Sequence, residues 1–77
     1  MNEFMRMARI AESMREQYPN GTRVECIYCG DPYRPIASGE KGTIDHIDDM
    51  ATAHIKWDNG RYFGLAYGED SFKKIVE

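Results

Sequence analysis

The chain has 77 residues, with 10 Lys and Arg against 13 Asp and Glu and a formal net charge of −3. Proteins bind phosphate backbones through clustered basic faces, and the sequence has none, so we do not expect a nucleic-acid partner. Two cysteines are too few for the disulfide framework of a secreted domain. No apolar run approaches the length of a membrane span. We expect one small cytoplasmic domain that binds no membrane and needs no cofactor.

The first 18 residues are predicted to form an amphipathic helix. Apolar side chains recur at helical spacing, at Phe4, Met7, Ala8, Ala11, Met14 and Tyr18. Asn2 is the candidate N-cap, and Pro19 ends the pattern. The apolar stripe is suited to a lid over the rest of the domain, or to a partner or homodimer contact through Phe4, Met7 and Met14.

A first strand is predicted at Thr22–Tyr28, with Val24 and Cys26 on one face. The connection that follows, residues 29–41, contains two prolines and two glycines, which disfavour any regular element. Because loops of this length are unusual in so small a domain unless they carry function, this connection is a candidate binding loop.

The middle of the chain is typical of antiparallel strands. A second strand is predicted at 42–48, with a turn at 48–51. Apolar and polar residues then alternate over 53–57, which is the period of a half-buried strand. Asn59-Gly60 favours a tight hairpin turn into a fourth, aromatic-rich strand. The alternation places Trp57 in the core.

The end of the chain is predicted to make a helical turn at 70–72 and a short last strand at 74–76. Five short strands, one long first connection and tight later turns predict a small, strongly bent antiparallel β-barrel. The expected fold is therefore mainly β with one N-terminal α-helix, the helix at 1–18 and the five-stranded barrel at 19–77.

Several motifs occur in a fixed order along the chain. They are Tyr18-Pro19-Asn20-Gly21-Thr22-Arg23-Val24, Asp31-Pro32-Tyr33, Gly39-x-x-Gly42-Thr43, Ile55-x-Trp57-Asp58-Asn59-Gly60 and Gly68-x-Asp70-x-Phe72. This succession covers about residues 18–76 and resembles an uncharacterised family of small bacterial and phage domains, classed only as a domain of unknown function. The resemblance implies a fold, and an origin in a bacterium, phage or mobile element, more firmly than an activity.

A wider similarity concerns Gly21-x-Arg23-Val24, the Gly39 and Gly42 pair, and Trp57–Gly60. These elements look like the SH3-like repeats of the Mind bomb and HERC ubiquitin ligases, which bind peptide segments of partner proteins. The Gly-x-x-Gly-x-Ile element also resembles ribosome- and polymerase-associated KOW barrels. The similarity implies an SH3-like barrel, with peptide binding as the first role and a KOW-like nucleic-acid or ribosome-associated accessory role as the alternative.

We expect a non-enzymatic protein-interaction module, because no catalytic set or phosphate-binding loop can be named. SH3-type barrels dock extended, proline-bearing peptides in an aromatic groove beside the long first loop. The candidate partner-binding residues are Tyr33 and Asp31 in that loop, with Tyr62 and Tyr67.

A metal site is the weaker possibility. Cys26 and Cys29 have the spacing of a zinc half-site, and His46 and His54 can supply two further ligands. There is no second closely spaced pair, and these residues serve equally well as core cysteines and outer-face histidines. A small zinc-binding module therefore remains the second alternative.

Overall fold

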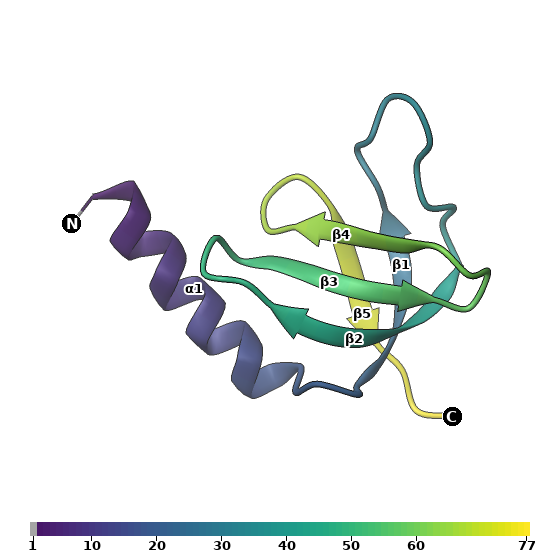
Figure 1. Ribbon diagram of the computed structural model, residues 1–77, viewed down its shortest axis with the longest axis horizontal. Coiled ribbons are helices and arrows are strands. Elements are labelled where there is room, and N and C mark those ends of the chain that lie inside the picture. The colour runs from purple at the N-terminus through teal and green to yellow at the C-terminus, as the bar shows by residue number, and fades with distance from the viewer. Residues whose placement is uncertain (1) are drawn as a thin grey trace.

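The fold consists of one helix and five strands in a computed structural model that describes residues 2–77 (Figure 1). The elements are α1 (Glu3–Gln17), β1 (Arg23–Tyr28), β2 (Lys41–Ile47), β3 (Thr52–Trp57), β4 (Tyr62–Ala66) and β5 (Ser71–Lys74). The prediction of a mainly β fold with one N-terminal helix is confirmed; residue 1 of the predicted helix span lies outside the described residues. Within residues 2–77, no helix has both the length and the apolarity needed to cross a membrane.

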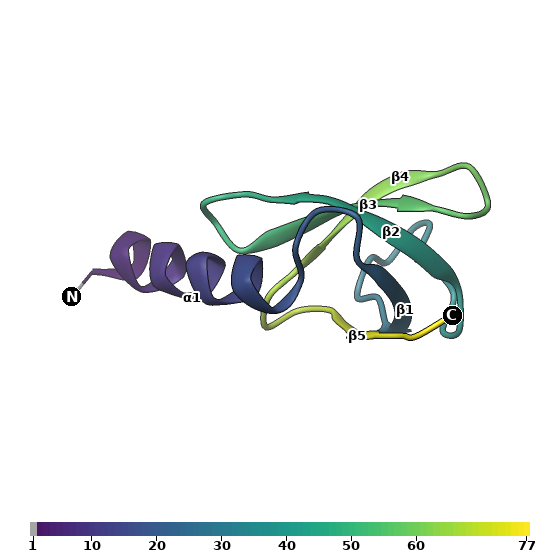
Figure 2. The same cartoon turned by 90° about the horizontal axis from the view of Figure 1, so that it is seen from below.

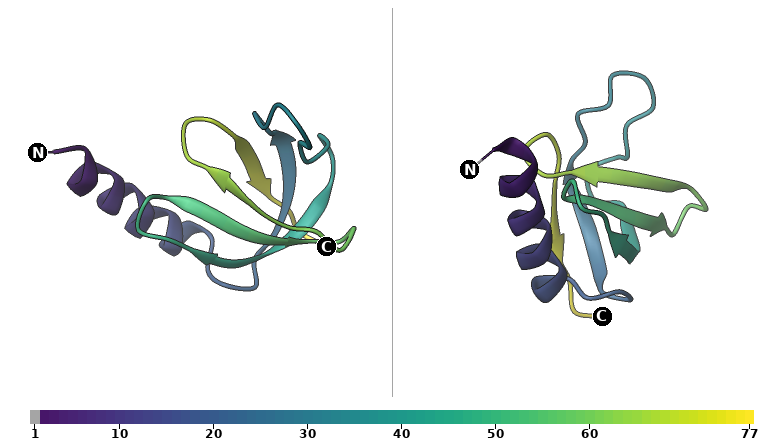
Figure 3. Two further views of the ribbon diagram at one scale, coloured as in Figure 1. Left: turned by 45° about the horizontal axis from the view of Figure 1, so that its top comes forward. Right: turned by 60° about the vertical axis from the view of Figure 1, so that its left-hand side comes forward.

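The strands form a single antiparallel sheet in the order β4-β3-β2-β1-β5. The sheet bends strongly between β3 and β1 (Figures 2 and 3). In the described part of the chain β4 and β5 do not pair as strands, and only an isolated bridge between Tyr67 and Asp70 lies between them. Five antiparallel strands are therefore confirmed, whereas closure of the sheet into a barrel is not.

Helix α1 is fixed to the sheet by its C-terminal half. The Asn2 side chain accepts a hydrogen bond from the Met5 N–H (2.8 Å), which confirms the predicted cap. Near the other end, Arg15 Nε donates to the Ile47 carbonyl (2.9 Å) and its Nη2 pairs with Asp49 (2.8 Å). The N-terminal half projects beyond the strands (Figures 1 and 2).

The core lies inside the bend of the sheet. Ala53, Ile55 and Trp57 of β3 are all buried, as their alternation predicts. Trp57 is only 3 % exposed, and its Nε1 donates to the Phe63 carbonyl (3.1 Å), so its predicted place in the core is confirmed. Gly42 of β2 allows the close approach of β3, because a Cβ there would lie 2.7 Å from Ile55 Cγ2.

The last strand begins earlier than predicted. β5 spans Ser71–Lys74, so the predicted helical turn at 70–72 and the strand at 74–76 are wrong. The reason is tertiary: Phe72 pairs with Cys26 of β1, and its ring packs against Tyr18 at a centroid distance of 5.0 Å. These contacts extend the backbone where the local sequence is typical of a turn.

Candidate recognition site

The long connection between β1 and β2 has a fixed shape. Asp31 Oδ2 accepts hydrogen bonds from the N–H groups of Tyr33 (3.2 Å) and Arg34 (2.6 Å). Arg61, from the β3–β4 hairpin, donates to the Arg34 carbonyl (2.8 Å), and its guanidinium lies 5.1 Å from the centre of the Phe63 ring. The loop is thus held against the β3–β4 hairpin and the start of β4, so its conformation is fixed by contacts within the molecule.

Asp70 joins this loop to the turn between β4 and β5. Its Oδ1 accepts a hydrogen bond from the Gly30 N–H (2.6 Å), and its Oδ2 accepts one from the Ala66 N–H (2.8 Å). Hydrogen bonds to a charged acceptor are stronger than neutral ones. One carboxylate therefore holds the end of β4 and the start of the loop in a fixed relation.

An acidic hollow of about 620 Å³ lies between the loop, β4 and the β4–β5 turn. It is lined by Tyr28, Gly30, Asp31, Pro32, Phe63, Gly64, Ala66, Glu69 and Asp70. Three of these residues are acidic, and no Lys or Arg lines the hollow. The aromatic rings of Tyr28 and Phe63 add apolar surface. Such a lining is complementary to a positively charged, partly apolar ligand.

The acidic hollow adjoins the free edge of β4. Two hydrogen bonds flank β4: the Trp57 N–H donates to the Arg61 carbonyl (2.8 Å), and the Tyr67 N–H donates to the Ala51 carbonyl (3.1 Å). Because hydrogen-bonded pairs alternate along an antiparallel ladder, the backbone groups of the odd-numbered residues of β4 hydrogen-bond to β3. The backbone groups of Tyr62 and Gly64 therefore point away from the sheet. Those of Ala66 are already engaged within the β4–β5 turn.

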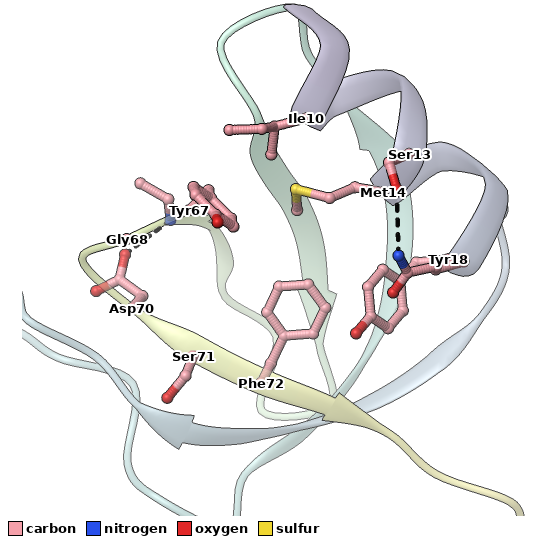
Figure 4. A pocket seen from close by; sticks show the side chains of 11 residues that line it. Ile10, Ser13, Met14, Tyr18, Tyr67, Gly68, Asp70, Ser71 and Phe72 are labelled. Atoms are coloured by element: carbon pink, nitrogen blue, oxygen red, sulfur yellow. Dashed lines mark hydrogen bonds between the residues drawn. The ribbon is translucent and has the colours of Figure 1, made fainter. Parts of the chain in front are cut away.

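An apolar hollow of about 600 Å³ lies on the other side of the β4–β5 turn, against the C-terminal half of α1 (Figure 4). It is lined by Ile10, Ser13, Met14, Gln17, Tyr18, Ala66, Tyr67, Gly68, Asp70, Ser71 and Phe72. Met14 reaches across toward Tyr67, with the Tyr18 and Phe72 rings side by side next to it (Figure 4). This hollow is largely apolar, unlike the acidic hollow.

The predicted partner-binding residues lie in separate places. Asp31 lines the acidic hollow, Tyr67 lines the apolar hollow, and Tyr33 is 87 % exposed on the loop. Tyr62 pairs in register with Lys56, so its side chain lies on the outer face of the sheet with that of Lys56. The single groove predicted for these four side chains is therefore not formed.

The sequence does not predict three residues that line the acidic hollow, namely Tyr28, Phe63 and Glu69. The only local signal is the length of the loop that follows Tyr28. The residues converge because Asp70 links the loop to the β4–β5 turn, and this contact joins positions 40 residues apart.

The predicted helix interface divides into a covered and an uncovered part. Met14 is 8 % exposed and belongs to the core, and Met7 packs partly against it. Phe4 remains 61 % exposed on the half of α1 that projects beyond the strands. The C-terminal half of the helix therefore covers the core as a lid, and a homodimer contact through Phe4 stays a prediction.

The predicted zinc ligands lie on opposite faces of the sheet. Cys26 and Cys29 are free and buried, and burial, reinforced by the charges of Cys29, Asp70 and Glu40, raises the pKa of the Cys26 thiol to about 11. His46 and His54 pair on the outer face, with ring centroids 4.5 Å apart. Among residues 2–77 no three His, Cys, Asp or Glu side chains are placed to hold one metal ion, and a tetrahedral site of these four is not assembled.

The two histidines belong to a hydrogen-bonded cluster on the outer face. Asp45 Oδ2 contacts His46 Nδ1 (2.8 Å) and accepts the Tyr62 hydroxyl (2.7 Å), and His54 Nε2 lies 2.8 Å from Asp48 Oδ2. The hydrogen bonds from Tyr62 and His46 lower the pKa of Asp45, and the same carboxylate raises the pKa of Tyr62. Each of these side chains has a hydrogen-bond partner within the cluster.

Asp48 makes stability depend on pH. Burial alone would raise its pKa, but hydrogen bonds from His54 and from the N–H groups of Thr52 and Met50 outweigh burial and lower the pKa below 3.8. A carboxyl group whose pKa is lower in the folded than in the unfolded state stabilises the protein at pH values above its unfolded-state pKa. This stabilisation is lost as the pH falls through its folded-state pKa. We expect the melting temperature of the wild type to fall more steeply below about pH 4 than that of Asp48→Asn. Parallel melting profiles for the two proteins would contradict this assignment.

The comparisons with known proteins identify the family. The family model described as Domain of unknown function (DUF4314) matches residues 7–75. Because the match covers more than half of the chain, the protein belongs to this family, and the predicted resemblance to an uncharacterised domain family is confirmed. A comparison with curated proteins found no match.

Proposed function

Starting from this family membership, we propose that the protein is a non-enzymatic protein-interaction module. It takes up an extended segment of a partner protein between the β1–β2 loop and β4. The observation that carries the proposal is the free backbone edge of β4 at Tyr62 and Gly64, directly beside the acidic hollow. Extended peptides bind to such edges by adding a strand, and neighbouring pockets select their side chains.

The lining of the hollow specifies the chemistry of the partner. Asp31 and Glu69 favour Lys or Arg side chains, and the Tyr28 ring suits the apolar stems of those side chains or their cations, whereas the Phe63 ring already lies beside the Arg61 guanidinium. The partner segment is therefore extended and basic. The acidic lining repels phosphate groups, so it favours a protein partner over a nucleic acid.

The proposal includes a finer description of the fold. The strand order β4-β3-β2-β1-β5, the long first connection and the strong bend support an open SH3-like architecture. As the sequence resemblance implies, the module would act in the cytoplasm of a bacterium and be encoded by the bacterium or by a phage or mobile element. Recognition by added strand differs from the groove of tyrosines that the sequence predicts.

Selection of peptides from a random phage-displayed library tests the proposal. We expect the wild type to enrich extended sequences rich in Lys and Arg. Their affinity should fall about tenfold or more in Glu69→Lys, which reverses a charge in the acidic hollow. The matched control is Glu16→Lys, which makes the same charge change on the exposed surface of α1 and should leave the affinity unchanged.

Two results would overturn the proposal. In the first, no peptide is enriched over selections against an unrelated protein of similar charge. In the second, the enriched peptides bind Glu69→Lys as tightly as the wild type, which would place their site elsewhere on the molecule.

A further inference from the structure

The sheet has a second free edge, on β5. The Ile75 N–H donates to the Arg23 carbonyl (3.0 Å), and the register continues with Lys73 opposite Glu25. By the alternation of an antiparallel ladder, the backbone groups of Phe72 and Lys74 point away from β1. β5 has β1 as its only strand neighbour among residues 2–77, so these groups lie on a free edge.

The two free edges differ in how well they are protected against pairing. Natural edge strands are usually blunted by charged side chains, prolines or bulges. β5 carries Lys73 and Lys74. β4 has the sequence Tyr-Phe-Gly-Leu-Ala, with neither charge nor proline. An uncharged edge of five residues is expected to be covered by another strand.

The surface beside each edge strand is complementary to the side chains of the other edge strand. The acidic hollow, with Asp31 and Glu69, lies beside the β4 edge and suits Lys74 of β5, whereas Lys73 already lies 3.7 Å from Glu25 of β1. The apolar hollow extends along β5 to Ser71 and Phe72, and it suits the uncharged, aromatic β4. The two strands are also similar in length, at five and four residues.

From this complementarity we propose that the β4 edge of one copy of the protein pairs with the β5 edge of a second copy. The inference rests on the proposed function and names the occupant of the same site. The contact is head-to-tail, because each copy offers a different edge to each neighbour. A head-to-tail contact forms a closed ring if its rotation closes and a filament if it does not.

Proline scanning of the two edges tests the pairing. Tyr62→Pro removes an outward N–H from β4 and Lys74→Pro removes one from β5, while neither N–H bonds to the neighbouring strand in the sheet. Tyr62→Ala and Lys74→Ala are the matched controls, since they remove the same side chains and keep the N–H groups. Sedimentation velocity over a wide concentration range reports the oligomeric state.

The wild type and both alanine variants are expected to form oligomers, and each proline variant alone is expected to remain monomeric. A mixture of Tyr62→Pro and Lys74→Pro should form a one-to-one dimer, because one variant keeps an intact β5 and the other an intact β4. A monomeric wild type, assembled proline variants, or a mixture that stays monomeric would each overturn the inference.

If a proline variant fails to fold, charge-reversal variants of exposed side chains test the same contact. Glu69→Lys and Lys74→Glu should each weaken assembly alone, and mixing them should restore assembly to the wild-type extent, since at every contact the lysine of one variant then faces the glutamate of the other. If the mixture does not associate, the inference fails.

The outcomes separate the inference from the proposed function. A monomeric wild type that binds selected basic peptides in a Glu69-dependent way refutes pairing between copies and leaves peptide recognition in place. Pairing between copies without binding of any peptide refutes recognition of a foreign partner. Assembly that survives both proline variants and depends on Phe4 would assign the contact to α1 and overturn the inference.

Discussion

Replacement of Trp57 by alanine is expected to lower the free energy of unfolding by about 3–5 kcal/mol. The indole is 3 % exposed, and it packs on Gly42 where β2 and β3 approach closely. Its Nε1 also satisfies the Phe63 carbonyl of β4. A domain of this size has a stability of only about 5–15 kcal/mol, so at the low end of that range the variant should keep at most about 2 kcal/mol.

Urea unfolding followed by circular dichroism measures this loss. Trp57→Phe is the matched control, because it keeps an aromatic ring but removes the donor to Phe63, and a loss of about 1–2 kcal/mol is expected. A loss below about 1 kcal/mol in Trp57→Ala would contradict the core role of the indole.

The second large effect is expected at Asp70. Asp70→Ala leaves the N–H groups of Gly30 and Ala66 without their carboxylate acceptor and should cost about 2–3 kcal/mol. It should also reduce peptide binding, because the acidic hollow is shaped by these two hydrogen bonds. Urea unfolding gives the stability, and the amide resonance of Gly30 reports the local change.

The neighbouring carboxylate is the matched control for Asp70. Glu69→Ala removes an exposed side chain, and we expect a change within about 0.5 kcal/mol. Asp70→Asn keeps the shape and one oxygen acceptor, so its loss should be intermediate. Equal stability of Asp70→Ala and Glu69→Ala would show that the two hydrogen bonds do not hold the turn.

The elements with strong local periodicity could be predicted from sequence. The helical stripe and the Asn2 cap define α1, and the alternation around Ile55 defines β3 and the burial of Trp57. At the hairpin Gly60 has φ +94°, as its place in the turn predicts. In each case neighbouring residues determine the structure, so a short window of sequence contains the information.

The features that depend on distant contacts could not be predicted. β5 contains two lysines and no alternating pattern, and it is extended only because it pairs with β1. The sequence predicts a strong bend, but whether the bend brings β4 and β5 together depends on contacts between distant strands, and the two strands do not pair in residues 2–77. The sequence therefore predicts five antiparallel strands correctly, but it does not predict that β4 and β5 remain unpaired.

The candidate site was predicted in part. The long loop and Asp31 do form one side of the acidic hollow, since loop length and turn chemistry are local signals. Tyr62 was assigned to the groove because it is aromatic, but strand pairing places its side chain on the outer face next to Asp45. The position of β4 at the edge of the sheet follows from the strand order, which the sequence of β4 alone does not determine.

The central claim is that the β4 edge recognises an extended segment, and amide hydrogen exchange tests it most directly. In Lys74→Pro at low concentration, the β4 edge is intact and the β5 edge of other copies is blocked. On addition of a selected basic peptide, the account predicts slowed exchange at Tyr62 and Gly64, with little change at Phe63, which already bonds to β3. Binding of the peptide with unchanged exchange at Tyr62 and Gly64 would contradict it.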